Sequence, residues 1–298
     1  MDMNKAITEM SDAALSPQEY AALAEQHGLR RSGIRPRLGP YIRELWQQRK
    51  FIWVLGSSDA YARHQDNYLG QLWAVLNPLL LAGAYYLIFG VLLGTDRDVD
   101  NFVGFLITGL FLFLYSGGNI TKASRSISTN LNLVRSLKFP RAVLPVAATL
   151  SEFLLVLPSM FVLLILMVVT GEHITWSWLL FPVVIILHLG INVGLSLFVA
   201  RLVHSSRDLR NLIPLVVRLL RYISGVFFSI DAYAGHGVVG ILMKYQPFAL
   251  VLDIARQALM GEFALDPPTW IVAGVWALAL PVIGLVYFWR AEATYGRN

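Results

Sequence analysis

A short basic segment, LNLVRSLKFPRAVL at residues 131–144, lies between two long hydrophobic stretches of this 298-residue chain. It has three positive charges and no negative ones, and Pro140 interrupts it. The pattern predicts a short helix with Phe139 exposed at its end, which is barely stable alone in water. We expect it to dock into a groove on a partner protein; a charged loop that only holds the membrane topology is the alternative. One face of this helix holds Leu131, Val134, Leu137 and Lys138.

Two arginines within a hydrophobic stretch, Arg218 and Arg221, indicate a polar environment inside a membrane. An arginine that faces lipid at mid-membrane costs about 2.5 kcal/mol or more, so we expect both to face a cavity or to extend to the membrane edge. Tyr222 follows Arg218 by one helical turn and shares its face. Tyr85 and Phe89 share a face of an earlier hydrophobic stretch in the same way.

Several kinds of chemistry are absent from the sequence. No G-x-x-x-x-G-K-[ST] motif occurs, so the chain has no P-loop for ATP. It contains no cysteine and no clustered set of histidines and carboxylates, so we expect no metal site and no cofactor bound by this chain. His188 is expected to be packed and hydrogen-bonded rather than a ligand. Glu152 is either a functional residue or the ion-pair partner of a basic residue in 122–141.

The composition indicates an all-α polytopic membrane protein. Hydrophobic residues make up 56% of the chain and charged residues 14%, whereas soluble domains have roughly 25% charged residues. A run of about 20 apolar residues is long enough to cross about 30 Å of hydrocarbon as a helix. We predict six transmembrane helices, at residues 72–93, 102–121, 142–170, 174–203, 211–230 and 269–289.

The segments outside these spans have patterns of their own. The N-terminal extension, residues 1–39, is expected to contain a short capped helix from Ser16. Residues 40–56 favour an amphipathic helix in the membrane surface over an ordinary soluble one. Residues 231–268 are apolar but broken by charges and Pro247, so we expect half-inserted helices that pack against protein. The interfacial helix is characterised by Arg43, Trp46, Arg49, Lys50 and Trp53.

The distribution of basic residues predicts the orientation of the chain. Of the 24 lysines and arginines, 19 fall in the N-terminal segment, the 122–141 and 201–210 connections and the C-terminal tail. Three fall in the opposite loops, and two lie within the predicted fifth span. By the positive-inside rule, this multi-pass protein of the cytoplasmic membrane has both termini in the cytoplasm. The net charge of +5 is therefore explained by topology and not by nucleic-acid binding.

Four motifs occur in a fixed order along the chain: YLGQLWAVLNPLL (68–80), NLNLVRSLKFPRAVLP (130–145), RDLRNLIPLVVRLLRYISGVFFS (207–229) and QPFALVLDIARQALMGEF (246–263). They resemble the motifs of ABC-2 type permeases that export polysaccharides, the O-antigen, capsule and teichoic-acid exporters. Gln246-Pro247 stands where that family often has Asn-Pro, which weakens any role for the amide. The N-terminal extension further resembles the actinobacterial branch, whose substrate is the lipid-linked galactan of the cell wall.

The resemblance implies an architecture and partners. Residues 57–298 would form the ABC-2 transmembrane domain of a half-transporter, which makes a homodimer and binds two separate ATPase subunits that hold ATP and magnesium. The interfacial helix and the connection between the second and third spans would contact the ATPase. The implied coupling residues are Leu131, Val134, Arg135, Leu137, Lys138, Phe139, Arg207 and Asp208.

The implied substrate is a polysaccharide linked to a polyprenyl pyrophosphate, which would pass among membrane lipids. Its pyrophosphate needs cations near the cytoplasmic leaflet, and Arg43, Arg49, Lys50 and Arg63 are available, as are those near the 122–141 connection. Its sugars need a wet channel with aromatic walls, although aromatic residues in spans are usually packing residues. The candidates for this substrate path are Tyr85, Tyr86, Phe89, Arg218, Arg221, Tyr222, Phe227 and Phe228.

Three functions are compatible with these patterns. The first is a permease subunit, not itself an enzyme, that exports a lipid-linked cell-surface polysaccharide by means of a separate ATPase. The second is an ABC-2 exporter of drugs or lipids; the tryptophans of the interfacial helix and the LG-x-LW…NP motif count against it. The third is a membrane-embedded glycosyl- or phosphotransferase, which needs a cluster of acids or histidines at the membrane surface. The loop acids Asp96, Asp98 and Asp100 are on the outer side without such a set.

Overall fold

The computed structural model describes residues 37–63, 72–94, 99–206, 208–230 and 237–295. All of them belong to the second of two compact units, residues 37–298. The capped helix predicted near Ser16 and the coupling candidate Arg207 lie outside the described residues. The regular secondary structure of the described residues is entirely helical, which confirms the all-α class.

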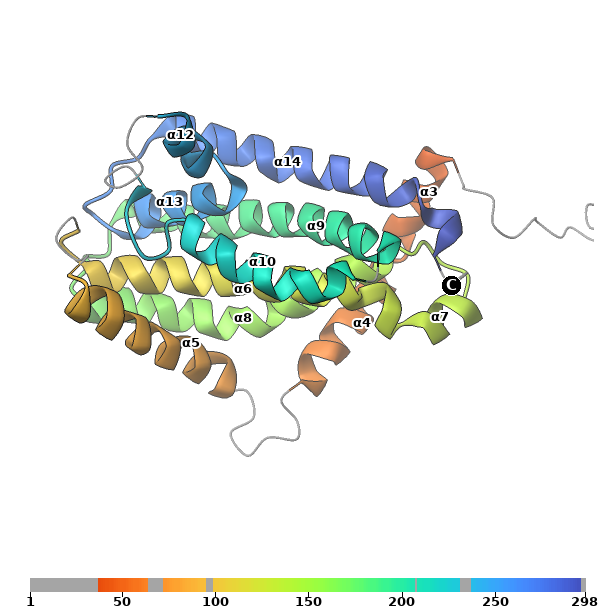
Figure 1. Ribbon diagram of the computed structural model, residues 1–298, viewed down its shortest axis with the longest axis horizontal. Helices are drawn as coiled ribbons and strands as arrows, with labels where there is room; N and C mark the ends of the chain where they lie inside the picture. The colour runs from red at the N-terminus through yellow and green to blue at the C-terminus, as the bar shows by residue number, and fades with distance from the viewer. Residues whose placement is uncertain (1–36, 64–71, 95–98, 207, 231–236, 296–298) are drawn as a thin grey trace, which may run out of the picture. The chain divides into compact units, whose positions relative to one another are not determined.

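Five helices of the described residues are long and apolar enough to cross a membrane, which confirms a polytopic membrane protein (Figure 1). Each coincides with a predicted span, although the second continues beyond its predicted end at 121 to Thr129. The five are residues 72–92 (α5, Leu72–Tyr85, continued by the π-helical segment Tyr86–Leu92), α6 (Phe102–Thr129), α8 (Val143–Val169), residues 176–205 (a short helix, Trp176–Leu180, then α9, Phe181–Ser205) and α14 (Pro267–Trp289).

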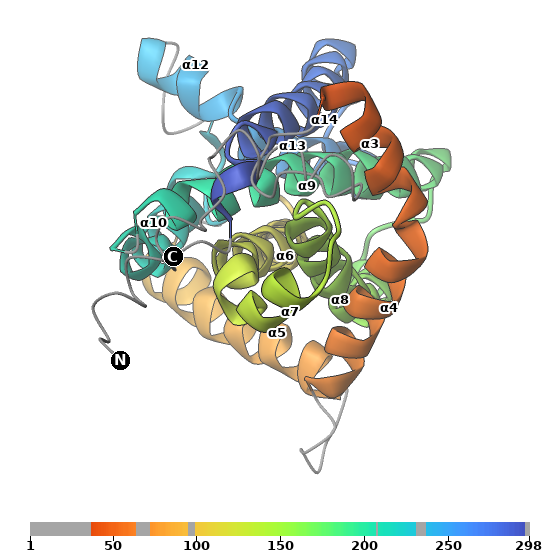
Figure 2. The ribbon, with the colours of Figure 1, turned by 90° about the vertical axis from the view of Figure 1, so that its right-hand side faces the viewer.

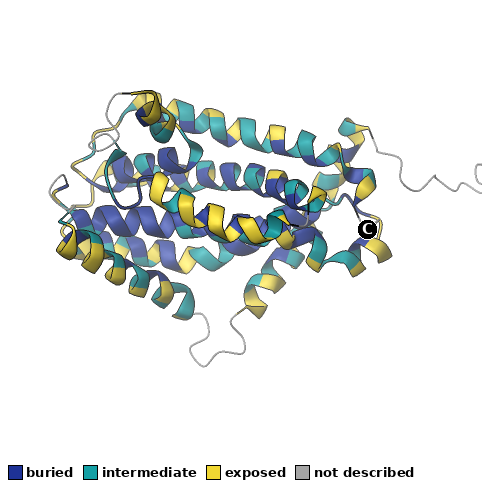
Figure 3. Ribbon diagram, viewed as in Figure 1, coloured by how far each residue is buried: buried dark blue, intermediate teal, exposed yellow. Residues whose placement is uncertain are grey.

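Helix α6 lies at the centre of the bundle, with the other long helices around it (Figure 2). In its most apolar 18-residue window, 83% of the residues are buried by the chain itself, against 17% for residues 72–92. Figure 3 shows the same contrast, with α6 largely buried and the outer helices widely exposed. Because lipid is as apolar as these exposed side chains, hydrophobic burial alone does not hold such a bundle together.

Buried polar contacts hold α6 against α9. The Asn119 side chain donates from Nδ2 to the carbonyl oxygen of Asn192 (2.9 Å) and to its side-chain Oδ1 (3.0 Å). One turn away, Ser116 Oγ and His188 Nε2 are joined by a hydrogen bond of 2.7 Å. His188 is thus a packed and hydrogen-bonded residue, as the sequence predicts, and no group among the described residues could hold a metal ion.

The prediction of one membrane-long helix over residues 211–230 is wrong. Helix α10 (Leu209–Ile223) has 15 residues and is therefore about 22 Å long, shorter than the roughly 30 Å of hydrocarbon. It ends because Gly225 adopts a left-handed φ of 72° and turns the chain. The apolar pattern continues through residues 226–228 although the helix does not, so hydropathy alone could not locate this end.

The segment predicted to be half-inserted forms two helices, α12 (Val238–Lys244) and α13 (Pro247–Leu259), which are bent by 68° relative to each other. Helix α13 is almost entirely buried and packs on α6, α9 and α14. At the bend, the Gln246 side chain donates from Nε2 to the carbonyl oxygen of Ile223 (3.0 Å), so the amide ties α13 to the end of α10. The bend and the burial fit helices packed against protein at membrane depth. That they stop half-way through the bilayer stays a prediction.

The predicted interfacial helix is a pair of helices. Helices α3 (Leu38–Gln47) and α4 (Arg49–Ala62) meet at Gln48, so helical structure extends past the predicted end at residue 56. Helix α4 packs along α8, and a Cβ added at Gly56 would lie only 3.0 Å from the carbonyl oxygen of Ala147. On the outer surface Trp46 and Trp53 are 71% and 56% exposed, as expected of side chains that enter a membrane surface.

The segment after α14 closes over α3. The short helix Glu292–Thr294 buries Glu292, whose Oε2 accepts a hydrogen bond from the Tyr41 hydroxyl (2.8 Å) and whose Oε1 accepts one from the backbone N–H of Arg141 (2.9 Å). The Tyr41 hydroxyl accepts a further bond from the backbone N–H of Ala142 (3.2 Å). These four residues, the Glu292 clasp, join the first described helix, the start of α8 and the end of the chain. Burial outweighs the hydrogen bonds and raises the pKa of Glu292 above its ordinary value.

The Glu292 clasp makes stability depend on pH. Because the pKa of Glu292 is raised in the folded chain, its contribution to stability is fully present at low pH and is lost as the pH rises through the folded-state pKa. We predict that the thermal unfolding midpoint of the wild type, measured relative to Glu292→Gln, falls as the pH rises from about 4.5 to 8. Unfolding of both proteins in detergent over this range provides the measurement. A difference that stays constant or grows with pH would contradict the prediction.

Candidate functional site

Helices α4, α6, α8 and α10 enclose a cavity of about 580 Å³ toward the end of the bundle where α7 (Leu131–Ser136) lies. The sequence brings its lining together from segments more than 150 residues apart. Gly117 and Gly118 of α6 contribute to the wall, and a Cβ at Gly118 would lie 2.6 Å from Glu152 Oε2. Glycine is therefore what lets a carboxylate approach the α6 backbone here. The charged residues of this cavity, the charged cavity from here on, are Asp59, Arg63, Lys122, Arg125, Glu152 and Arg221.

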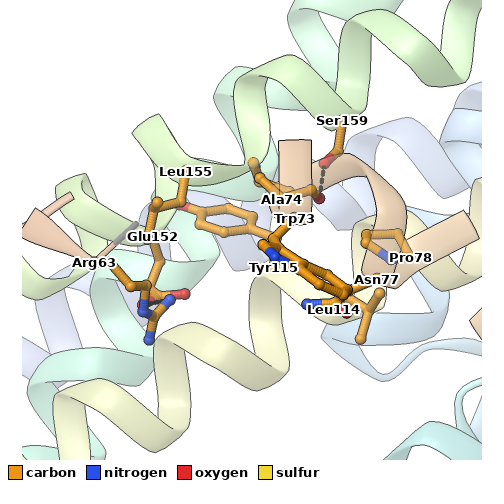
Figure 4. Close-up of a pocket in the computed structure, with 11 residues that line it drawn as sticks. Arg63, Trp73, Ala74, Asn77, Pro78, Leu114, Tyr115, Glu152, Leu155 and Ser159 are labelled. Carbon is orange, nitrogen blue, oxygen red and sulfur yellow. Dashed lines mark hydrogen bonds and ion pairs between the residues drawn. The ribbon is translucent and has the colours of Figure 1, made fainter. Parts of the chain in front are cut away.

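Ion pairs cross the charged cavity between three helices. Arg63, directly after α4, reaches Glu152 of α8 at 2.9 Å between Nη1 and Oε1, and Figure 4 shows the two side chains together. Lys122 of α6 pairs with Asp59 of α4 and lies 3.5 Å from Glu152 Oε1. Ser151 donates to Asp59 Oδ2 (2.8 Å) and accepts from Lys122 Nζ (2.6 Å). Glu152 thus has the basic partner in 122–141 that was one of its two predicted roles, together with Arg63.

The carboxylate of Asp59 is held ionised by this network. Burial acts to raise the pKa of Asp59, but the hydrogen bonds from Lys122 and Ser151 outweigh that effect and hold the pKa below its ordinary value. Two carboxylates therefore face four cations in the cavity, since Arg63, Lys122, Arg125 and Arg221 all line it. The site has an excess of positive charge.

A second cavity of about 580 Å³ adjoins the first between α5, α6 and α8 (Figure 4). Arg63, Leu114 and Glu152 line both cavities. The second is mainly apolar, and its wall includes the buried Tyr115, whose hydroxyl has no hydrogen-bond partner among the described residues. Its other lining residues are Trp73, Ala74, Asn77, Pro78, Leu155, Val156 and Ser159.

Four of the predicted substrate-path aromatics form a cluster between α5 and the end of α10. Phe227 is its centre, with its ring centroid 4.5 Å from that of Phe89, 4.6 Å from Tyr85 and 5.3 Å from Tyr222. Arg221 donates to the Tyr85 hydroxyl at 3.1 Å and so links this aromatic cluster to the charged cavity. Phe227 is completely buried, so it lines no open path in this conformation.

The remaining path candidates lie outside this cluster. Tyr86 is exposed on the π-helical segment, and Phe228 is half-buried and packs against the core. Arg218 is exposed on α10, one turn from Tyr222, which shares its face as the sequence predicts. A role for any of them in substrate passage stays a prediction.

Arg256 positions the aromatic cluster, and sequence reasoning had treated it only as an interruption of an apolar stretch. Its guanidinium is buried, lies 3.3 Å from the centroid of the Phe105 ring and donates to the carbonyl oxygens of Phe105 (3.3 Å) and Gly225 (2.9 Å). A third carbonyl, that of Val226, lies at 3.4 Å. The turn that leads into Phe227 is therefore held by one side chain of α13. Its signal in the sequence was a lone arginine in an apolar helix, which must find partners when buried.

The docking segment of residues 131–140 differs from its prediction at Phe139 and at Val134. Phe139, expected to be exposed, is only 5% exposed and packs with Phe51 of α4 edge to face at 5.5 Å. Val134 is 3% exposed and belongs to the same small core, whereas Leu137 is 50% exposed. The segment folds back on α4 because two of its apolar residues have partners within the chain. Leu137, with the exposed Arg135 and Lys138 beside it, is the predicted anchor that stays exposed, and its contact with a partner stays a prediction.

The other predicted contact residues are on the surface. Arg43, Arg49 and Lys50 are exposed on α3 and α4, and the guanidinium of Arg49 lies 5.9 Å from the Trp46 ring centroid. Asp208 is exposed just before α10. Arg43, Arg49 and Lys50 do not line the charged cavity, whereas the predicted pyrophosphate-binding residue Arg63 does, together with Lys122 and Arg125 of the 122–141 connection.

The sequence profile of the ABC-2 type transporter family matches residues 51–260. The chain belongs to this family. Similar proteins include the O-antigen export system permease protein RfbA of Myxococcus xanthus, 26% identical over 257 residues that cover 85% of this chain and 94% of the relative. RfbA of Klebsiella pneumoniae is 26% identical over a region that covers 79% of this chain and 89% of the relative. The polysialic acid transport protein KpsM of Escherichia coli is 25% identical over a region that covers 76% of this chain and 87% of the relative. The ABC-2 match includes the charged cavity, the aromatic cluster and Arg256, but not Tyr41 and Glu292 of the Glu292 clasp.

Arg256 provides a test of how the ABC-2 fold holds its aromatic cluster. We predict that Arg256→Ala lowers the free energy of unfolding by about 3 kcal/mol or more, because buried carbonyl oxygens lose their donor and a cavity is left. Arg290→Ala, which removes an exposed arginine beyond α14, is the matched control and should change stability little. Thermal unfolding in detergent compares the two. Equal losses would show that Arg256 is not the holding contact.

Proposed function

We propose that this chain is the permease subunit of a transporter that exports a lipid-linked cell-surface polysaccharide, with ATP hydrolysed by a separate subunit. The main support is that relatives which this chain matches over nearly their whole length are named for O-antigen export and polysialic acid transport. The sequence has no P-loop of its own, so the energy must come from a partner. We propose galactan as the cargo because the N-terminal extension resembles the actinobacterial branch of these exporters.

The site suits the two halves of such a substrate. Cations of the charged cavity, Arg63, Lys122 and Arg125, offer partners for a pyrophosphate. The aromatic cluster beside it offers flat faces on which sugar rings stack, with Tyr222 on its exposed side. Arg221 belongs to the first group and contacts the second through Tyr85. The substrate would therefore meet cations first and aromatic rings next.

We further propose that the permease works as a homodimer bound to two ATPase subunits. Support comes from α10, whose Leu212, Leu215, Val216 and Leu219 are exposed on a helix that also holds the exposed Arg218. An arginine so placed is costly against lipid, whereas a second copy could cover it across a wet path. Against an exporter of drugs or lipids, the discriminating measurement is whether a polyprenyl-linked glycan copurifies with the complex.

The proposed orientation places both termini and α7 in the cytoplasm of cells whose plasma membrane holds the protein. Because the chain has no cysteine, single cysteines report accessibility directly. We predict that His173→Cys, exposed between α8 and α9, reacts with an impermeant thiol reagent in intact cells, and that Ser136→Cys, exposed at the end of α7, reacts only after the cells are opened. Reaction of Ser136→Cys from outside would place α7 beyond the reach of an ATPase.

The partner is expected to hold the docking segment through Leu137. We predict that Leu137→Asp abolishes copurification with the ATPase and stops display of the polysaccharide at the cell surface, because a carboxylate would be buried unpaired in the partner's groove. Arg135→Ala on the rim should cost about 1 kcal/mol of binding or less.

Val134→Asp is no substitute for this test, since Val134 is packed within the chain and the variant would unfold the segment itself. A Leu137→Asp protein that binds the ATPase with near-native affinity would move the docking site to the 201–210 connection or to α3 and α4. If Leu137→Asp and Arg135→Ala both abolish surface polysaccharide, or if neither does, the result would count against polysaccharide export through this docking segment.

A further inference from the structure

A third cavity, of about 300 Å³, lies between the ends of α6 and α9 and the starts of α7 and α10. Figure 1 shows these elements at the same end of the bundle. The cavity shares no lining residue with the charged cavity or with the cavity beside α5, so it is a separate site. The residues that line this end cavity are Ser124, Ile127, Ser128, Leu131, Ala200, Val203, His204 and Arg210.

The polar half of the end cavity offers hydrogen-bond donors to an anion. Arg210 makes no ion pair with a carboxylate of the described residues, and its Nε is buried without a hydrogen-bond partner among them. His204 adds ring nitrogens, and the hydroxyls of Ser124 and Ser128, which donate to carbonyl oxygens of their own helix, can rotate toward a ligand instead. None of the described lining residues is acidic, and the exposed Asp208 lies outside the cavity. An arginine fork with hydroxyl donors around it suits a phosphate group.

The other half of the lining is apolar and indicates that the phosphate is esterified. Ile127, Leu131, Ala200 and Val203 present only hydrocarbon to the cavity. A free phosphate gains nothing from such a wall, whereas an ester covers it with its apolar part. The volume is at the lower end of the range for ligand cavities. It therefore admits the phosphate and the adjoining part of the ester, and the rest of the molecule lies outside.

The position of the cavity along α6 gives its depth in the membrane. With 28 residues, α6 is about 42 Å long and exceeds the roughly 30 Å of hydrocarbon by about 12 Å. The predicted second span ends at residue 121, so the excess lies at the end of α6 that lines the cavity. Ser124 and Ser128 lie about 5 and 10 Å beyond residue 121 along the helix axis. That distance places them in the headgroup layer, where the phosphates of the lipids are.

We propose that the end cavity binds the phosphate group of an anionic phospholipid of the surrounding leaflet, through Arg210 and His204, and so fixes the starts of α7 and α10 to the ends of α6 and α9. Basic pockets between spans suit anionic headgroups, which the cytoplasmic leaflet provides; that the leaflet is the cytoplasmic one rests on the proposed orientation. Leu131 begins the docking helix, and the ring of Tyr295, beside the Glu292 clasp, lies 4.7 Å from that of His204. The lipid is therefore a fixed component at the base of the docking segment, and not cargo.

Selectivity for an anionic lipid tests the proposal directly. The purified permease is titrated with phosphatidylglycerol and with the zwitterionic phosphatidylcholine, and bound lipid is counted by native mass spectrometry. Arg210→Gln should weaken the binding of phosphatidylglycerol by about tenfold, because a charge-assisted hydrogen bond is lost. Arg210→Lys, which keeps the charge without the fork, should weaken it by only about threefold. Arg290→Gln, which removes an exposed arginine beyond α14, is the matched control and should leave affinity unchanged.

Occupancy of the end cavity has its own readout. Ser128→Cys places the sole thiol of the chain on the cavity wall. Its reaction with a thiol reagent should be about fivefold slower in phosphatidylglycerol nanodiscs than in phosphatidylcholine nanodiscs, because a bound lipid shields it. Arg210→Gln should abolish this difference. Ser205→Cys, exposed at the end of α9, should react at one rate throughout.

The arms of the experiment separate the possible occupants. Inorganic phosphate that shields Ser128→Cys as well as phosphatidylglycerol does would support the phosphate site and assign it to a soluble anion. Phosphatidylcholine that binds as tightly as phosphatidylglycerol, or an Arg210→Gln protein that keeps full binding and shielding, would overturn the proposal. Shielding by the ATPase subunit and by no lipid would assign the cavity to the partner protein and overturn it as well.

Two further comparisons keep the result interpretable. If Arg210→Gln unfolds at a lower temperature than the wild type in phosphatidylcholine, the graded loss in Arg210→Lys and the shielding of Ser128→Cys decide the matter. None of these measurements depends on the cargo or on export. A failure of lipid binding therefore leaves the proposed function standing, and a failure of polysaccharide export leaves the phosphate site standing.

Discussion

The central position of α6 is the constraint on which the rest of the structure depends. A helix surrounded by other helices within lipid gains little from apolar burial, because lipid would serve as well. It is held instead by contacts that lipid cannot make: Asn119 with Asn192, Ser116 with His188, and Lys122 with the acids of α4 and α8. Its glycines admit neighbours that a Cβ would exclude, including Glu152 at Gly118. Of these residues, Lys122, Gly118 and Glu152 also form the wall of the charged cavity, whereas Asn119 and Ser116 contact α9.

Because α6 continues directly toward α7, the cavity and the docking segment belong to one mechanical unit. Val134 and Phe139 fold the docking segment onto α3, α4 and the start of α8, and the Glu292 clasp fastens the end of the chain to the same place. A displacement of Leu137 is therefore transmitted to α4, to α8 and to the segment after α14 together. The fold leaves little compliant chain between the surface proposed for the ATPase and the cations proposed for the substrate.

The fold could be predicted from the sequence wherever one property decided the outcome. Length and hydropathy located five spans because lipid selects for those properties directly, and the face pattern located helical structure at residues 40–56, whose position in the membrane surface stays a prediction. The end of α10 was missed because a single glycine at positive φ outweighs an apolar pattern that runs on to Phe228. In the site, aromatic spacing indicated that Tyr85 and Phe89 share a face, but their packing around Phe227 and the pairing of Lys122 with Asp59 depend on tertiary contacts. Phe139 was misplaced for the same reason, since its partner, Phe51, is distant in sequence.

Among the described residues, the hydrogen bonds that Arg256 makes to the turn after α10 go to main-chain oxygens, those of Gly225 and Val226, while its contact with the Phe105 ring lies on α6. A contact of this kind is indifferent to the side chains at the positions it holds. Apart from Gly225, whose φ requires a glycine, the turn after α10 can therefore exchange residues without loosening. Phe228, which is only partly buried, can vary in size and polarity while its backbone stays in place, whereas Phe227 is packed in the core. One buried arginine thus separates the support of this turn from its composition, so that the surface we propose for the substrate could differ among related permeases while the backbone that carries it stays the same.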